Sequence, residues 1–313
     1  MTTVIFMGTP KFSVPILKGI IDHGYQVLGV VTQPDHKIKG VVSESAVKKF
    51  ALYNGLTIFQ PKILKQSDEL LKIEELHPDL IITAAYGQFL PLSLLKSVKI
   101  AAINVHGSLL PKYRGGSPVQ YALKNNDDKT GITIMYMVSK MDAGDIIAQK
   151  ELKIQTNDNS ETLFNKLSII GRDLLIEYLP SIINKTAKSV KQDESKVTYA
   201  YNLKSNEEHI NINWPAEKIN GLVRALYPKP GAYLNLCGVR TKILKINIMN
   251  LKSNYEPGIV VFKNKKKLVV SAGNGTSFEI LSLKPSGKKI QSIVEYLNGH
   301  GRNIRIGDKI IID

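Results

Sequence analysis

The first 32 residues restrict the fold most, because they place a helix between two short apolar runs. Residues 2–7 and 26–32 are apolar and rich in β-branched side chains, which is typical of buried strands. Residues 12–23 have a helical pattern with Pro15 in the first turn and Gly24 at the end, where each residue is tolerated. Strand, helix and strand in this order predict an open α/β sheet with helices against its faces.

The turn after the first strand has a glycine, Gly8, but it does not have the pattern of a dinucleotide-binding loop. No G-x-G-x-x-G follows it, so a nicotinamide or flavin cofactor has little support from this sequence. The turn still lies before a helix N-terminus and can close over a ligand there.

Two polar residues lie near the end of another apolar strand, at residues 101–106. Asn104 and His106 are two residues apart, so the period of a strand places their side chains on one face. Ligands bind at this end of the strands in open α/β sheets. Residues 107–118 follow with three Gly and two Pro, which suits backbone wrapped closely around a ligand. A single histidine in such a place is more often a structural residue than a catalyst.

An acidic turn offers His106 a partner. Residues 131–138 are predicted to form a strand, and the turn at 141–145 that follows contains Asp142. An amide, an imidazole and a carboxylate together can bind a developing oxyanion and move a proton, which one histidine alone cannot do. Asn104, His106 and Asp142 are therefore the candidate catalytic residues.

Two apolar residues follow the predicted central strand, residues 79–84. Phe89 and Leu90 lie in a loop after it, where both would be unfavourable in solvent. They suit a pocket for a flat heterocycle, and packing in the core is the alternative.

Composition limits the compartment and the chemistry. Cys237 is the single cysteine, so an intramolecular disulfide and a thiolate metal cluster are excluded and a reducing compartment is favoured. The N-terminus lacks the pattern of a secretory signal, and no apolar run approaches the ~18 residues of a membrane span. We expect a cytoplasmic protein, and a chain of 313 residues is long enough for two domains.

The C-terminal third has a different pattern. Residues 181–213 are polar, as in a linker, and a helix is predicted at 216–226. Short strands broken by Gly and Pro then predict a small β-barrel. These strands are expected at residues 232–236, 240–249, 258–262, 267–270, 277–283 and 309–312.

Positive charge is concentrated in this third. The chain has a net charge of +15, and residues 205–313 hold 17 Lys and Arg against 8 Asp and Glu, a net charge of +9. Such an excess attracts a polyanion through phosphate contacts, although a lysine-rich composition without a nucleic-acid role gives the same count. Small barrels often bind nucleic acid, which favours the first explanation.

A resemblance to a known family rests on motifs spread from Met7 to the turn at 285–289. The chain closely resembles methionyl-tRNA formyltransferases. The Asn-x-His…Asp set and Ser-Leu-Leu-Pro alone indicate only the wider folate-dependent formyltransferase group, and the basic C-terminal barrel narrows the choice. The motifs are MGTPKFSVPIL, VTQPD, AAYGQFLP, INVHGSLLPKYRGGSPVQ, TGITIM, MDAGDII, VTYAYNL and YPKPGAY.

This resemblance implies a Rossmann-like open-sheet formyltransferase domain followed by an OB-like β-barrel that binds tRNA. We place these domains at residues 1–188 and 208–313, with a linker at 189–207. The reaction implied is transfer of the formyl group of 10-formyltetrahydrofolate, a co-substrate, to the α-amino group of methionine on initiator tRNA. The product, N-formylmethionyl-tRNA, serves translation initiation. No metal is needed, and a monomer is expected.

The resemblance also implies roles for single residues. Asn104 and His106 donate hydrogen bonds to the developing oxyanion, while Asp142 orients the imidazole and favours its protonated form. The folate contacts implied are Ser108, Leu109, Leu110, Pro111, Phe89 and Leu90, and the tRNA contacts are Lys37, Lys39, Lys112 and Arg114.

Some of these tRNA contacts have alternatives. The loop at 34–45 has lysines but no arginine, and Lys gives a point charge where Arg gives a planar fork. Arg114 could equally be a structural residue that holds its own loop in place. The lysines at 263 and 265–267 could lie on a solvated hairpin without contacting tRNA. Two rival functions remain, a formyltransferase acting on a small molecule such as an amino sugar, and an inactive RNA-binding protein with the same fold.

Overall fold

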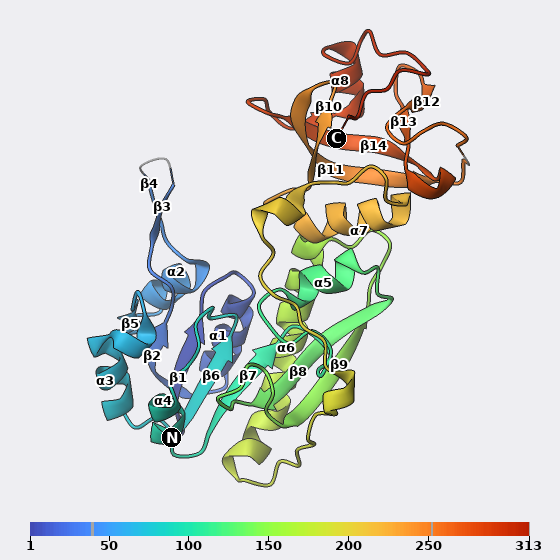
Figure 1. Cartoon of the computed structure of the whole chain (residues 1–313). Helices are drawn as coiled ribbons and strands as arrows, with labels where there is room; N and C mark the ends of the chain where they lie inside the picture. The colour runs from blue at the N-terminus through green and yellow to red at the C-terminus, as the bar shows by residue number, and fades with distance from the viewer. Residues whose placement is uncertain (39–40, 252, 313) are drawn as a thin grey trace. The chain divides into compact units, whose positions relative to one another are not determined.

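The computed structural model describes residues 1–38, 41–251 and 253–312 (Figure 1). These residues form two compact units. The first contains residues 1–118, 129–153 and 164–201, and the second contains residues 119–128, 154–163 and 202–313. Each unit therefore takes in segments that are distant in sequence.

A seven-stranded sheet forms the centre of the first unit, in the order β5-β2-β1-β6-β7-β8-β9. The strands from β5 to β7 are parallel, while β8 and β9 are antiparallel to their neighbours. The predicted open α/β sheet is confirmed, with two antiparallel strands at one edge. The strands are β1 (Thr3–Gly8), β2 (Gln26–Val31), β5 (Ile58–Phe59), β6 (Leu80–Ala84), β7 (Ala101–His106), β8 (Lys129–Tyr136) and β9 (Ile146–Lys153).

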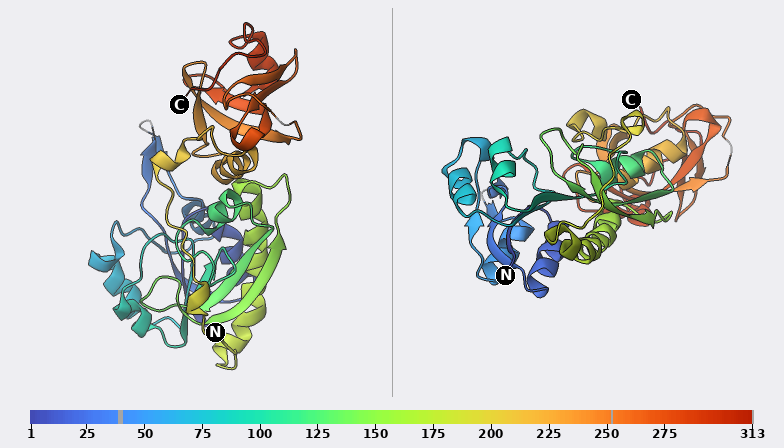
Figure 2. Two further views of the ribbon diagram at one scale, coloured as in Figure 1. Left: turned by 45° about the vertical axis from the view of Figure 1, so that its right-hand side comes forward. Right: turned by 90° about the horizontal axis from the view of Figure 1, so that it is seen from below.

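Helices cover both faces of this sheet (Figures 1 and 2). On one face, α3 (Asp68–Glu75) and α4 (Leu92–Ser97) pack against alternate residues of β1 and against Ala102 of β7. On the other face, α1 (Ser13–Asp22) lies against α6 (Ser160–Ile183), and Gly171 of α6 lies close to Val105. Asn104 and His106 follow Ala102 by two and four residues, so all three side chains point to the same face of the sheet. This is the face that α3 and α4 cover.

The chain adds its first strands on one side of β1 and its later strands on the other side. From β1 it passes to β2 on one side, and it later returns to β6 on the other. Such a switch point opens a crevice at the carboxyl ends of the strands. Helix α2 (Ala46–Tyr53) begins after Ser45, whose Oγ accepts a hydrogen bond from the Lys48 amide.

A hairpin lies within residues 34–45, which the sequence assigns to a loop. Strands β3 (His36–Ile38) and β4 (Val41–Ser43) pair antiparallel. The prediction of a plain loop is wrong here, because strands of three residues are too short to show alternation in the sequence. Lys39 lies outside the described residues, and so does the side chain of Lys37.

An antiparallel sheet forms the second unit, in the order β10-β11-β14-β13-β12, with β15 paired to β14. Leu236 of β10 pairs with Ile311, and Ile259, beside β12, pairs with Lys309, so the C-terminal segment joins the two edges. Joined edges are what a barrel requires. The strands are β10 (Tyr233–Leu236), β11 (Val239–Met249), β12 (Val260–Lys263), β13 (Leu268–Ser271), β14 (Ser277–Pro285) and β15 (Gln291–Ser292).

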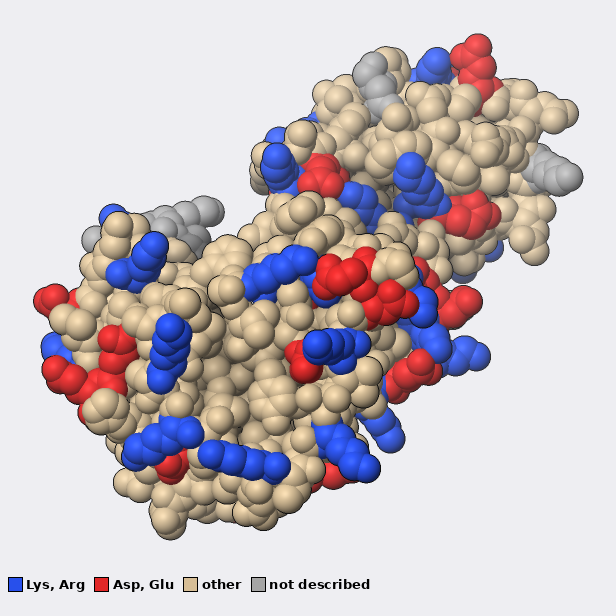
Figure 3. Space-filling model, turned by 60° about the horizontal axis from the view of Figure 1, so that its bottom comes forward, with Lys and Arg blue, Asp and Glu red and all other residues tan. Residues whose placement is uncertain are grey.

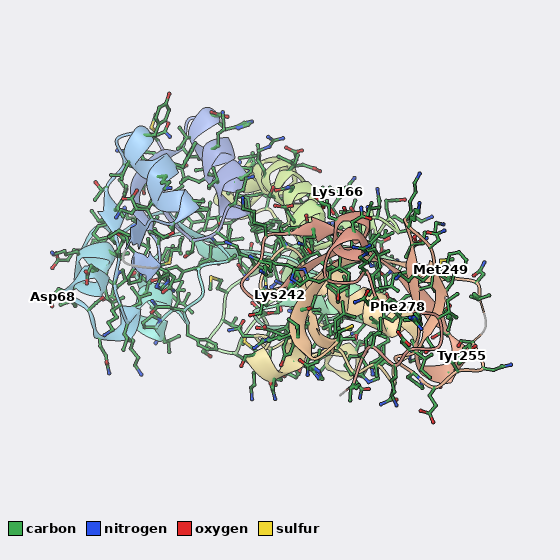
Figure 4. All side chains as sticks on the ribbon, turned by 90° about the horizontal axis from the view of Figure 1, so that it is seen from above. Asp68, Lys166, Lys242, Met249, Tyr255 and Phe278 are labelled. Atoms are coloured by element: carbon green, nitrogen blue, oxygen red, sulfur yellow. The ribbon has the colours of Figure 1, made fainter. Side chains whose placement is uncertain are left out.

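The strand predicted at residues 309–312 is wrong, because this segment makes single bridges to two different partners. Helix α7 (Ala216–Leu226) has the predicted bounds, and its apolar face packs into the core of the second unit. Phe278 of β14, labelled in Figure 4, is fully buried in the same core. Two more helices, α5 (Pro118–Lys124) and α8 (Ile293–Asn298), were too short for a prediction; α8 begins with a capping box of Ser292 and Glu295.

Residues 190–200, which the sequence assigns mainly to a linker, pair with the backbone of the first unit. Val190 bridges to Ile146, and Tyr199 bridges to Arg114. The Arg114 amide donates to the carbonyl of Thr198 at 2.9 Å. These are backbone contacts, so the polar side chains gave no sign of them. The domain boundaries stay a prediction.

Candidate active site

The structure brings Asn104, His106 and Asp142 together at the carboxyl end of β7. The Asn104 amide donates from Nδ2 to Oδ1 of Asp142 at 3.2 Å. The other carboxylate oxygen, Oδ2, accepts from the Gly115 amide at 2.8 Å and lies 3.7 Å from Nδ1 of His106. The carboxylate is therefore the centre of the cluster, held from the strand on one side and from the glycine-rich loop on the other.

The imidazole of His106 is buried and has a defined orientation. Its Nε2 lies 2.9 Å from the carbonyl oxygen of Tyr113. A carbonyl only accepts, so Nε2 carries the hydrogen and Nδ1 faces Asp142. The 3.7 Å between Nδ1 and Oδ2 is too long for a hydrogen bond. Nδ1 is thus the nitrogen that remains to interact with a reacting group.

Thr83, near the end of β6, fixes the amide of Asn104. Its hydroxyl donates to Oδ1 of Asn104 at 2.8 Å, so the amide oxygen faces Thr83 and the nitrogen faces Asp142. The amide nitrogen has a second hydrogen, which can serve a substrate oxygen. Thr83 was not predicted from the sequence, although a hydroxyl in the otherwise apolar run of β6 is a signal that could have identified it.

The backbone of Asp142 is strained and is held by Gln192. Its φ of 46° lies in the left-handed region, which costs a residue with a Cβ roughly 1–3 kcal/mol. Nε2 of Gln192 donates to the carbonyls of Asp142 and Gly144, each at 2.8 Å. Gln192 therefore secures the turn that presents the carboxylate. Its polar surroundings in the sequence gave no signal, because a solvated glutamine has the same pattern.

Arg114 is part of this support, and its predicted contact with tRNA stays a prediction. It is fully buried, and its Nε and Nη2 donate to Oε1 of Gln192 at 3.0 and 2.9 Å. Nη2 also lies 2.7 Å from a carboxylate oxygen of Glu194. A guanidinium without exposed surface does not reach a phosphate in this conformation. The alternative stated from the sequence, that Arg114 pins its own loop, fits the structure.

Replacing Gln192 by glutamate should lower kcat about 10- to 100-fold, because misplacement of a reacting group by about 1 Å has effects of this size. Glutamate keeps an oxygen for Arg114 but sets its other oxygen against the carbonyls of Asp142 and Gly144. Steady-state kinetics measure the change. The matched control is Lys191→Gln on the same segment, an exposed residue. Equal kcat values in Q192E and in K191Q would contradict this positioning role.

The ion pair of Glu194 with Arg114 makes the stability of the fold depend on pH. Arg114, and after it Lys140, hold the pKa of the Glu194 carboxyl below its ordinary value of 4.5. A lowered pKa means that the pair stabilises the fold above pH 4.5 and that this stabilisation is lost as the pH falls through the lowered value. Glu194→Gln should therefore lower the Tm at neutral pH, and the difference should vanish in acid.

The measurement is thermal unfolding of both proteins across a pH series. Glu151→Gln is the control, because Glu151 pairs with Lys129 where both side chains are more than half exposed. A Tm difference between the wild type and E194Q that stays constant down to pH 2 would argue against the ion pair as its source.

The predicted folate contacts on the loop at 107–118 differ in their exposure to solvent. Ser108 and Leu110 are buried, and the Ser108 hydroxyl donates to the Lys112 carbonyl at 2.6 Å. Thr133 bonds to the backbone of both residues, accepting from the Leu110 amide and donating to the Ser108 carbonyl. The side chains and these backbone groups of the two residues are therefore occupied inside the protein, and their contact with folate stays a prediction. Leu109 and Pro111 keep exposed surface.

Phe89 and Leu90 line a cavity of about 690 Å³ in the first unit, together with Ile63, Lys65, Leu70, Gln88, Pro91, Leu92, Ser93 and Ser139. Phe89 is 71% exposed, so packing in the core does not explain it, whereas Leu90 packs partly against the core below α3 and α4. The larger cavity in the second unit, about 740 Å³ beside α7 and β11, contains none of the predicted site residues.

The predicted tRNA-binding lysines are placed only in part. Lys112 is exposed, with its ammonium 4.8 Å from the centre of the Tyr113 ring. In the second unit, Lys263 donates to the carbonyls of Gly301 and Arg302, which gives it a structural role. The lysines at 265–267 are exposed in the turn between β12 and β13. Figure 3 shows Lys and Arg spread over the visible face with acidic residues between them, and not gathered in one patch.

Within residues 1–38, 41–251 and 253–312, no group of three His, Cys, Asp or Glu side chains is arranged to hold a metal ion. None of the helices described there combines the length and the apolar character needed to span a bilayer.

Comparison with known proteins identifies the family. Residues 1–179 match the formyl transferase family, and residues 202–301 match the formyl transferase C-terminal domain. The methionyl-tRNA formyltransferase of Ligilactobacillus salivarius is 55% identical over 100% of this chain and 99% of its own length. That of Lactobacillus johnsonii is 52% identical over 99% of both chains. The chain belongs to the methionyl-tRNA formyltransferase family.

Membership of the methionyl-tRNA formyltransferase family confirms the resemblance inferred from the motifs, and with it the expectation of a formylating enzyme of translation initiation. The fold is shared more widely. A crystal structure of WlaRD, a sugar 3N-formyl transferase in the presence of dTDP and 5-N-formyl-THF, has a TM-score of 0.69. It covers 92% of this chain and 99% of its own at 21% identity, which supports the fold alone.

Proposed function

We propose that the chain transfers the formyl group of 10-formyltetrahydrofolate to the α-amino group of methionine esterified to initiator tRNA. The observation that carries this proposal is the cluster of Asn104, His106 and Asp142 at the carboxyl end of β7, in the family that formylates methionyl-tRNA. The cluster offers two hydrogen-bond donors and one carboxylate, which is the set that formyl transfer to an amine requires.

The reaction begins with attack of the neutral amine on the formyl carbon. A bond forms between the amine nitrogen and this carbon, and negative charge develops on the formyl oxygen. The second hydrogen of the Asn104 amide and protonated Nδ1 of His106 donate to that oxygen. The buried position of His106 excludes water and strengthens the interaction.

The tetrahedral intermediate collapses with loss of tetrahydrofolate. The bond from the formyl carbon to N10 of the folate breaks, the amine nitrogen loses a proton, and N10 gains one. His106 and Asp142 are the titratable groups of the cluster, with Nδ1 and Oδ2 3.7 Å apart, so they carry this proton. The Gly115 amide keeps the carboxylate in place during the transfer.

The folate is assigned to the cavity around Phe89 and Leu90. A cavity of about 690 Å³ with an exposed phenyl ring and aliphatic side chains suits a flat heterocycle. Leu109 and Pro111, the predicted folate contacts with exposed surface on the glycine-rich loop, complete the assignment. The related fold of WlaRD was solved in the presence of 5-N-formyl-THF, which is consistent with a folate as the donor here.

The tRNA is assigned to lysines on the loop of the active site, on the hairpin of β3 and β4 and on the second unit. Lys112 lies on the loop that contacts Asp142 through Gly115, so its ammonium suits the phosphates near the aminoacyl end. Lys37 and Lys39 stay predicted contacts, and the exposed lysines at 265–267 add positive charge to the second unit. We place the reaction in the cytoplasm, where translation begins, and we propose that the chain acts as a monomer.

The direct test is identification of the formylated atom. Methionyl initiator tRNA is incubated with 10-formyltetrahydrofolate carrying a labelled formyl group, and the aminoacyl nucleoside is released by nuclease and analysed by mass spectrometry. The proposal predicts label on the α-amine of methionine. The rival, a formyltransferase for a small amino sugar, predicts no label on the tRNA but transfer to a nucleotide-linked amino sugar.

A further inference from the structure

Two tyrosines on the segment after residue 190 form a stacked pair on the surface of the first unit. The rings of Tyr199 and Tyr201 have centroids 5.6 Å apart and planes only 2° from parallel. They are 41% and 60% exposed, while Ala200 between them is fully buried. This alternation is that of an extended segment, in which residues two apart share a face.

The pair is attached to the loop that holds Asp142. The Ala200 amide donates to the carbonyl of Arg114 at 2.8 Å, and the Ser117 amide donates to the carbonyl of Ala200 at 3.0 Å. Gly115 lies between these contacts, and a Cβ at this glycine would be 2.6 Å from the oxygen of Ala200, so the two backbones touch here. The amide of the same glycine donates to Asp142.

Exposed parallel rings suit a flat ligand. Most exposed apolar residues occur singly, whereas two rings fixed in one orientation present an aromatic face at little cost in conformational entropy. Nucleobases stack on such faces whatever their sequence. In methionyl-tRNA, the methionine is esterified to the 3′-terminal adenosine, so the adenine lies within one ribose of the attacking amine. The base must therefore be near the loop to which the tyrosines are attached.

We propose that Tyr199 and Tyr201 form a stacking platform for the adenine of the 3′-terminal adenosine of methionyl-tRNA. This assignment rests on the proposed function and adds a base-binding site to it. The platform orders the terminal nucleotide, and Lys112 on the adjoining loop attracts its phosphate. The aryl ring of the folate is the other flat group in the reaction, and the kinetic measurements below separate the two.

The test uses the full chain, three protein variants and two substrates. Tyr201→Leu removes the more exposed ring, Tyr201→Phe keeps a ring, and Tyr53→Leu is the control, a tyrosine that is 90% exposed on α2. The substrates are methionyl-tRNA with a normal 3′ end and methionyl-tRNA whose terminal nucleotide lacks its base. Far-UV circular dichroism and Tm establish that each variant is folded.

With the normal substrate, Y201L should raise KM for methionyl-tRNA by roughly 5- to 150-fold, the effect expected from loss of one stacked base. Y201F and Y53L should leave this KM unchanged. Removal of the terminal base should raise KM for the wild type by a similar factor and should have little further effect in Y201L. This coupling between one ring and one base would not arise from a merely structural role.

Two results would overturn the platform. One is a Y201L variant whose KM for methionyl-tRNA equals that of the wild type, and the other is a rise in KM for 10-formyltetrahydrofolate in place of the tRNA. Both presuppose that the wild type formylates methionyl-tRNA. If the wild type does not, the proposed function has failed, and the two failures are thereby distinguished.

Discussion

Replacing Asn104 by alanine should lower kcat for formyl transfer by ~100- to 1,000-fold, the usual cost of losing one donor to an oxyanion. The amide is oriented by Thr83 and Asp142, so its second N–H can be aimed at the formyl oxygen. The effect should lie in kcat, because the interaction strengthens only as charge develops on that oxygen. Single-turnover kinetics at saturating folate and tRNA measure this step directly.

Thr83 provides the matched comparison for this prediction. Thr83→Ser keeps the hydroxyl that donates to Asn104 at 2.8 Å, whereas Thr83→Val removes it with little change of shape. T83S should be close to the wild type, and T83V should fall between the wild type and N104A. Near-normal turnover in N104A, with the protein folded and folate bound, would remove Asn104 from the mechanism.

Replacing Asp142 by asparagine should reduce kcat by ~1,000-fold or more, as expected when a carboxylate that orients a catalytic histidine loses its charge. The carboxylate accepts from Gly115 through one oxygen and from Asn104 through the other. An asparagine has only one acceptor oxygen, so one of these donors must face an NH2 group. The variant therefore disturbs the oxyanion donor as well as the imidazole.

Asp145 on the same turn is the control for this variant, because its carboxylate forms no hydrogen bond or ion pair with the described residues. Asp145→Asn should keep nearly full activity. The dependence of kcat on pH adds a second measurement, since D142N removes one of the two titratable groups of the cluster. A pH profile in D142N that matches the wild type would refute the role assigned to Asp142.

The sequence allowed the centre of the site to be predicted because its signals are local. Asn104 and His106 are separated by the period of a strand, and the strand itself is a short apolar run, so their common face follows from geometry. The bounds of α7 follow in the same way from an amphipathic pattern that begins after Pro215. The acidic turn at 141–145, which follows a predicted strand, then supplied Asp142, although this residue is distant in sequence.

The contacts that hold the turn of Asp142 in place could not be predicted from the sequence, for a physical reason. Gln192 and Arg114 are polar residues in polar segments, and only the tertiary structure shows that the guanidinium is buried against the amide. The hairpin of β3 and β4 was missed because three residues are too few to show a period. The segment at 190–200 pairs through its backbone, which leaves no pattern in its side chains.

The most direct test of the whole account compares acceptors for the labelled formyl group of 10-formyltetrahydrofolate. Initiator tRNA charged with methionine, the same tRNA uncharged, and a nucleotide-linked amino sugar are each offered to the wild type and to N104A. The account predicts rapid transfer by the wild type to the charged tRNA alone, and transfer slowed ~100- to 1,000-fold in N104A. Transfer to the amino sugar, or equal rates in both proteins, would contradict it.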